Sequence, residues 1–180
     1  MKLISILPAL AGFLVLTACD TPSPSLLSID SVTTEKDTAA DPSLSGTWVD
    51  ADEKATLCII RPADKSGYDI LFIGGNTPTS FHAQLFRIDK TEFLDVTPGD
   101  DDDFRVSGHA IARIWNSGTR LRWGFLDSDW FKQQAAPLAN HSTEGKMLLL
   151  APPASVRAFI EANGLDEKAY GKTVTWQRSM

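Results

Sequence analysis

Few side chains in this 180-residue sequence have the types and spacing that predict chemistry. The three histidines, His82, His109 and His141, each stand alone, without the short ligand spacings that bring several donors around one zinc ion. Serine, histidine and aspartate residues occur, but no nucleophile elbow or phosphate-binding loop surrounds them. We therefore expect no metal site, no cofactor and no enzymatic activity.

The densest charge cluster is the run Asp100 to Asp103. Several carboxylates close together can bind Ca²⁺, but this run lacks the alternating ligands and the bidentate glutamate of an EF-hand loop. It follows Pro98-Gly99, which is typical of a turn. We interpret it as a solvated loop between two strands, where like charges also discourage edge pairing.

Apolar side chains form the remaining candidate site. Leu121, Trp123 and Phe125 alternate with polar or small residues, which is typical of a strand with one solvated face, and Trp115 precedes them. In a wide barrel these four residues would line a pocket for an apolar ligand, and in a narrow barrel they would fill the core. The pattern leaves both interpretations open.

The two cysteines have different surroundings. Cys58 lies in an apolar, β-prone run with no cationic neighbour within two residues, so we expect a buried, unreactive thiol. Cys19 ends a different pattern: a positive start at Met1-Lys2, an apolar run too short to span a bilayer, and then Leu16-Thr17-Ala18-Cys19.

Leu16 to Cys19 resembles the lipobox of bacterial lipoproteins at all four positions. The resemblance implies that residues 1–18 are a signal peptide and that Cys19 is lipidated and becomes the first residue of the mature protein. Its thiolate is the nucleophile that takes the lipid. Asp20 resembles the enterobacterial signal for retention in the inner membrane, although outer-membrane placement stays open. The expected location is the cell envelope, facing the periplasm.

Residues 19–44 are expected to form a flexible tether. The segment from Asp20 to Leu44 is rich in Thr, Ser, Pro, Asp and Ala and has no aromatic residue, so it offers little apolar surface to bury. As a random coil it would place the domain roughly 25–30 Å from the lipid. The domain itself is expected to span residues 45–180.

From residue 45 onward, short alternating runs separated by turn residues predict strands. Two further segments have helix signals, from Asp127 to about Ala136 and from Pro153 to Asn163, the latter followed by Gly164. The predicted strands are Gly46–Asp50, Thr56–Arg61, Tyr68–Gly74, Thr79–Asp89, Glu92–Thr97, Phe104–Asn116, Thr119–Leu126, Lys146–Ala151 and Thr173–Arg178.

This order predicts a mainly β fold: an antiparallel up-and-down β-barrel of eight or nine strands with one or two short α-helices, one of them before the last strand. Gly46-Thr47-Trp48 at the start of the first strand resembles the Gly-x-Trp opening of the lipocalin-like (calycin-type) barrels. The resemblance implies that Trp48 plugs the closed end and that Arg178 packs over it. The chain departs from secreted lipocalins in lacking their Thr-Asp-Tyr element and a disulfide.

Two functions are compatible with these features. The first is a lipid-anchored envelope protein that binds a small apolar ligand in its barrel, and the second is an interaction module, such as an inhibitor or assembly factor, with a filled barrel and no ligand. The expected partners are the membrane, through Cys19, and an apolar small molecule or an envelope protein. The net charge of −6 argues against nucleic acid, whose binding domains carry basic patches.

Overall fold

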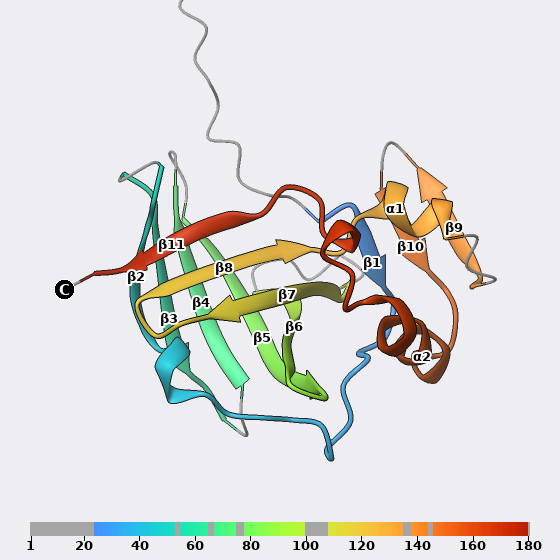
Figure 1. The fold of residues 1–180 in the computed structure, drawn as a ribbon, viewed down its shortest axis with the longest axis horizontal. Helices are drawn as coiled ribbons and strands as arrows, with labels where there is room; N and C mark the ends of the chain where they lie inside the picture. Colours follow the sequence, from blue (N-terminus) through green and yellow to red (C-terminus); the bar gives the residue numbers. More distant parts are fainter. Residues whose placement is uncertain are drawn as a thin grey trace, which may run out of the picture.

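The structure is a computed structural model that describes residues 24–52, 55–64, 67–74, 78–99, 108–134, 138–143 and 146–179. Its centre is a closed barrel of eight antiparallel strands in the order β11-β2-β3-β4-β5-β6-β7-β8 (Figure 1). Strands that are consecutive in the chain pair with each other from β2 to β8, and β11 closes the ring by pairing with both β8 and β2. The expected mainly β, up-and-down barrel is confirmed.

Most barrel strands have bounds within one residue of those predicted, because alternating side chains mark them clearly in the sequence. The exception is β7, which begins at Ala110 rather than at Phe104. The barrel strands are Gly46–Asp50 (β2), Leu57–Pro62 (β3), Gly67–Ile73 (β4), Thr79–Ile88 (β5), Thr91–Pro98 (β6), Ala110–Asn116 (β7), Arg120–Phe125 (β8) and Val174–Arg178 (β11).

A second, three-stranded sheet lies outside the barrel. Its central strand is β10 (Lys146–Leu149), which pairs in parallel with β1 (Leu26–Ser28) and antiparallel with β9 (Asn140–Thr143). The predicted strand at Lys146 therefore exists but does not belong to the barrel. The sequence pattern did not predict β1 or β9, which are too short to show a periodicity.

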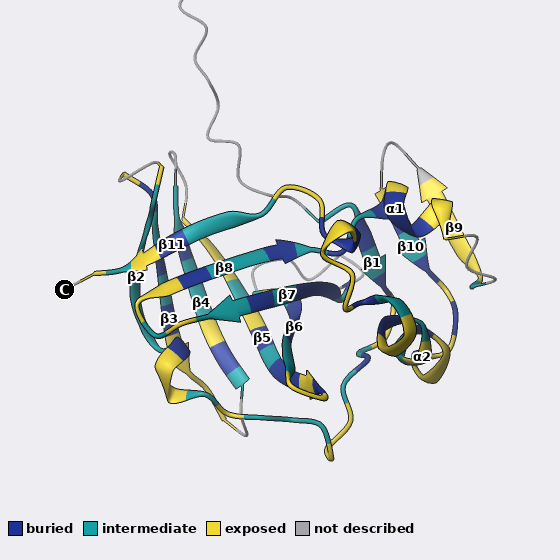
Figure 2. Cartoon of the chain, in the orientation of Figure 1, coloured by how far each residue is buried: buried dark blue, intermediate teal, exposed yellow. Residues whose placement is uncertain are grey.

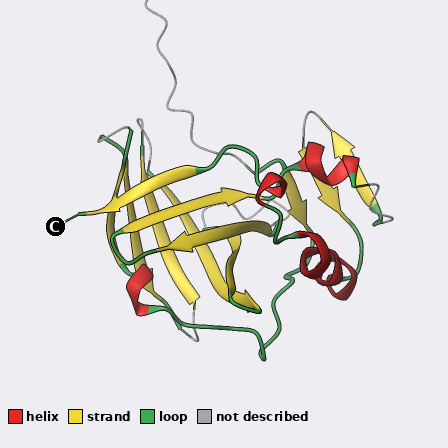
Figure 3. Cartoon of the chain, in the orientation of Figure 1, coloured by secondary structure: helices red, strands yellow, loops and turns green. Residues whose placement is uncertain are grey.

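The two labelled α-helices, α1 and α2, lie beside the barrel on the side of this small sheet (Figures 1 and 3). Helix α1 (Ser128–Gln133) begins after Asp127, whose side chain accepts hydrogen bonds from the backbone N–H groups of Asp129 and Trp130. Helix α2 (Pro153–Asn163) has proline at its first position and Gly164 just after its end. The described residues also include two short 3-10 helices, Pro42–Leu44 (η1) and Glu167–Ala169 (η2).

The described residues form two hydrophobic cores because the barrel wall is apolar on both faces in places. One core fills the barrel and includes Leu85, Leu94 and Ala112. The other lies between the outside of β5–β7 and the elements α1, α2, β1 and β10, and it includes Phe86 and Phe93, which alternate with the inward-facing residues. Figure 2 shows buried residues continuing from β7 into the neighbouring β1.

Residues 24–44, which we call the N-terminal segment, pack against the domain. Their composition predicts a flexible tether, but Leu26, Val32 and Leu44 are buried, and Ser28 exchanges backbone hydrogen bonds with His109. Thr38 also forms a β-bridge with Phe86 on β5. The segment is ordered because a few isolated apolar side chains and backbone pairs hold it, which average composition does not reveal.

Candidate functional site

The barrel encloses an apolar cavity of about 210 Å³. Its wall comes from inward-facing residues of six strands, since alternate side chains along each strand point to the same face. The lining residues are Pro24, Cys58, Ile60, Ile70, Phe72, Gly74, Thr79, Phe81, Leu94, Val96, Ile114, Leu121, Trp123 and Phe125. An engineered apolar cavity of about 150 Å³ binds benzene, so this one has room for a molecule of similar or somewhat larger size.

The cavity reaches one end of the barrel, which we call the mouth. Gly74 follows β4, Thr79 begins β5 and Phe125 ends β8, and all three line the cavity. Trp123 and Phe125 are only partly buried although they point inward, and their rings meet edge to face with centroids 5.0 Å apart. Pro24 of the N-terminal segment completes the lining, so this segment starts at the mouth.

The opposite end is closed by Trp48, which is fully buried. Its indole N–H donates to the carbonyl of Leu44 at 2.9 Å. The guanidinium carbon of Arg178 lies 4.4 Å from the centroid of the Trp48 ring. Arg178 also donates to the carbonyls of Gly118 at 2.8 Å and Ser45 at 2.9 Å. One cationic side chain therefore joins β11, the β7–β8 turn and the start of β2 over the buried indole.

Gly46 permits this closure for two reasons. Its φ angle is +142°, a value that residues with side chains rarely adopt. A Cβ atom there would also lie 2.6 Å from Nη1 of Arg178. Gly46, Trp48 and Arg178, the three residues assigned to closure by the lipocalin-like resemblance, thus lie together at one end of the barrel.

Cys58 lies in the cavity wall on β3 and is a free thiol. Burial raises its pKa to about 12, because a thiolate would lose its hydration inside the apolar barrel. The thiol therefore contributes apolar surface to the cavity and is protonated at neutral pH.

The structure brings three of the four predicted lining residues together and excludes the fourth. Leu121, Trp123 and Phe125 line the cavity. Trp115 instead lies on the outside of the barrel, because it pairs in register with Arg122, whose side chain points outward. The guanidinium carbon of Arg122 lies 4.0 Å from the Trp115 ring centroid, and that of Arg113 lies 4.7 Å away.

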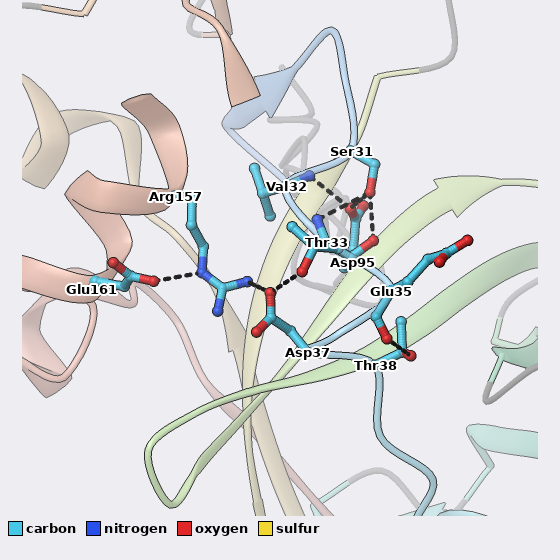
Figure 4. A network of polar contacts seen from close by, with 10 residues as sticks. Ser31, Val32, Thr33, Glu35, Asp37, Thr38, Asp95, Arg157 and Glu161 are labelled. Carbon is cyan, nitrogen blue, oxygen red and sulfur yellow. Dashed lines mark hydrogen bonds and ion pairs between the residues drawn. The ribbon is translucent and has the colours of Figure 1, made fainter. Parts of the chain in front are cut away.

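A buried carboxylate that sequence reasoning missed holds the N-terminal segment. Asp95 on β6 points out of the barrel and is 4% exposed. Its Oδ2 accepts hydrogen bonds from Ser31 Oγ at 2.7 Å and from the Val32 amide at 3.2 Å (Figure 4). Its Oδ1 lies 2.7 Å from Nδ1 of His109. The hydrogen bond to Asp95 raises the pKa of His109 above its usual value, although burial acts in the opposite direction.

A second polar contact holds the same segment farther along. Arg157 of α2 donates hydrogen bonds to Asp37 at 2.8 Å and to Glu161 at 2.9 Å (Figure 4). The first of these bonds holds the N-terminal segment against α2. The sequence signal for this arrangement was Asp95 itself, a charged residue between the apolar residues Leu94 and Val96. Nothing in the sequence indicated that Pro24 would reach the cavity.

Other predicted features stay separate from the cavity or outside the described residues. His82 and His109 border a shallow groove on the outer face of β4–β6, and His141 lies on β9. Within the described ranges, no three His, Cys, Asp or Glu side chains are grouped so that they could hold a metal ion. None of the described helices is both long and apolar enough to cross a membrane. Cys19, Asp20 and the run Asp100 to Asp103 lie outside the described residues.

Comparison of the chain with protein-family models, with curated proteins and with solved structures gave no match.

Proposed function

We propose that this protein is a lipid-anchored protein of the bacterial envelope whose barrel binds a small apolar molecule. The observation that carries the proposal is the cavity of about 210 Å³ inside the barrel, lined almost entirely by apolar side chains. Binding sites for small molecules are typically concave, apolar and largely preformed, as this cavity is. A barrel with a filled interior, which the interaction-module alternative requires, would leave no such space.

The anchor is supported by the sequence of residues 1–19. A positive start, a short apolar run and the complete lipobox-like stretch from Leu16 to Cys19 make Cys19 the residue that receives the lipid. A single acyl chain holds a protein only marginally, whereas two or more anchor it stably. Mass spectrometry of the purified protein tests this step, because lipidation predicts an N-terminal peptide that begins at Cys19 and carries diacylglycerol and acyl groups.

Ligand binding is tested with a matched pair of substitutions on β4. Ile70 lines the cavity, whereas its neighbour Leu71 points out of the barrel. We expect the unaltered protein to increase the fluorescence of 1-aminoanthracene, a small apolar probe, with saturable binding. Ile70→Trp should lower the affinity at least about tenfold by filling the cavity, a loss of about 1.4 kcal/mol. Leu71→Trp should leave it unchanged.

Native mass spectrometry gives a second measurement. A cavity ligand predicts an added mass that persists in native spray and disappears on denaturation. If no mass is added and the probe binds Ile70→Trp as tightly as the unaltered protein, the cavity is not a binding site and the proposal fails.

A further inference from the structure

A patch of aliphatic side chains on the outside of the barrel is not used by the fold. It consists of five partly buried residues that point outward from β2, β3 and β4, and none of them belongs to, or packs against, either core cluster of the described residues. We call these residues the outer patch: Val49, Leu57, Ile59, Leu71 and Ile73.

Strand register arranges the outer patch in rows. Leu57 pairs with both Val49 and Ile73, which makes one row across three strands. Ile59 pairs with Leu71 in the next row. All five side chains are partly exposed at the barrel surface. Large contiguous apolar patches on a protein surface mark protein or membrane interaction sites.

The polarity of this face changes sharply along the barrel axis. The row containing Leu57 and Ile73 lies nearest the mouth, since Gly74 follows Ile73 and lines the cavity there. The row beyond Ile59 and Leu71, toward the closed end, is charged: Arg61 pairs with Asp69. Two apolar rows lie about 7 Å apart along the strands, and a polar row begins about 7 Å farther on.

The short chain segment between Cys19 and Pro24 determines what can contact the outer patch. Pro24 lies at the mouth, and Cys19 precedes it by five residues, so the chain between them spans at most about 18 Å. A lipid on Cys19 therefore holds the mouth end of the barrel next to the bilayer. The apolar rows lie at that same end, and interfacial contacts typically bury apolar side chains about 5–10 Å deep, which is close to the spacing of the two rows.

From this geometry we propose that the outer patch contacts the lipid bilayer, with the barrel mouth facing the membrane surface and the charged row of Arg61 and Asp69 in water. The inference rests on the proposed function, because it takes Cys19 as the lipid-anchored residue. It goes further in assigning an orientation and a membrane-contacting surface. A cavity mouth held at the bilayer surface would also exchange an apolar ligand with the membrane directly.

The experiment uses spin labels on the lipidated full chain in phosphatidylcholine vesicles. Ile59→Cys places a label in the outer patch, and Arg61→Cys places a matched label on the same face of the same strand, in the charged row. Cys58 is buried and protonated, so it does not compete for the label. Accessibility to a water-soluble nickel complex and to oxygen is then measured for each label, after circular dichroism has shown that both variants fold.

We expect the label at position 59 to lose nickel accessibility several-fold and to gain oxygen accessibility in vesicles, while the label at position 61 stays accessible to nickel. Equal nickel accessibility at both positions in vesicle-bound protein would overturn the inference and leave the lipid anchor standing. Shielding of position 59 in a soluble Cys19→Ala chain without vesicles would assign the patch to a second copy and also overturn it. A chain that carries no lipid and does not bind vesicles would overturn both proposals.

Discussion

Replacing Arg178 with methionine tests how the barrel is closed. The guanidinium group donates hydrogen bonds to the backbone carbonyls of Ser43, Ser45 and Gly118 and stacks over the ring of Trp48. Methionine keeps much of the aliphatic stem but removes every one of these contacts. Losing these contacts should lower the free energy of unfolding, because they join three segments that are distant in sequence.

The size of this destabilisation can be worked out from the contacts that Arg178 makes. Each hydrogen bond contributes about 0.5–1.5 kcal/mol net, since Arg178 is half-buried and water can reach the released carbonyls. The cation–π contact adds about 0.5–1 kcal/mol. The Arg178→Met substitution should therefore lower the free energy of unfolding by about 2–5.5 kcal/mol. For a domain of this size, that corresponds to a fall in Tm of roughly 4–22 °C.

Urea unfolding followed by tryptophan fluorescence measures this change. Arg120→Met on β8 is the matched control, because Arg120 is exposed on the barrel surface, and the expected change is within about 0.5 kcal/mol. Arg178→Lys should fall between the two, since an ammonium group keeps the charge but cannot bond three carbonyls in the geometry of the guanidinium fork. Equal stabilities of Arg178→Met and Arg120→Met would refute the closing role of Arg178.

Three further predictions concern single residues. Cys58 should resist iodoacetamide at neutral pH until the protein unfolds, because burial raises the pKa of its thiol to about 12; mass spectrometry measures the modification. His109 pairs with buried Asp95, and this raises its pKa above the ordinary 6.5. The pair therefore stabilises the fold below pH 6.5, and the free energy of unfolding should fall as pH rises through the raised pKa of His109. Gly46→Ala should destabilise more than Gly118→Ala, because both have positive φ but only at Gly46 would a Cβ atom collide.

Controls separate these effects from general changes. His109→Gln should flatten the pH dependence of stability relative to the unaltered protein; identical slopes in the two proteins would contradict the role of the pair. For the glycines, equal losses in urea unfolding would show that the contact with Arg178 does not matter. Alkylation of Cys58 in native protein at the rate of the unfolded chain would show that the cavity wall opens readily.

The barrel was predictable because its strands are short alternating or apolar runs that end at turn residues. The alternation did not predict the position of Trp115, which was expected to line the cavity but lies outside the barrel. Trp115 and Trp123 are close in sequence and both aromatic, but they lie on opposite strands of a hairpin, and the register of the β7–β8 turn decides which face each occupies. Trp115 opposes outward-facing Arg122, whereas Ile114 opposes Trp123 and shares its inward face. A turn register shifted by one residue would reverse this, and the sequence alone does not fix it.

Composition did not predict that the N-terminal segment packs against the domain, and the physical reason is different. Composition averages over residues 20–44, where polar residues dominate, but ordering depends on where the few apolar ones fall. Leu26 packs into the outer core, and Leu44 packs into the barrel core beside Trp48, so the two ends of the segment are fixed at opposite ends of the barrel. Asp95 and Arg157 then hold the chain between them, with backbone pairing along the way.

This packing changes what the proposed lipid anchor on Cys19 would do. A free tether of 25 residues would let the domain rotate in any direction at roughly 25–30 Å from the bilayer. With the segment packed from Pro24 onward, only the chain between Cys19 and Pro24, which reaches at most about 18 Å, would separate the proposed lipid from the cavity mouth. In the proposed anchored protein, this short connection would bring the mouth end of the barrel to the membrane. Under that proposal, the buried contacts of Leu26 and Asp95 would govern which face of the barrel meets the lipid, although neither residue lines the cavity.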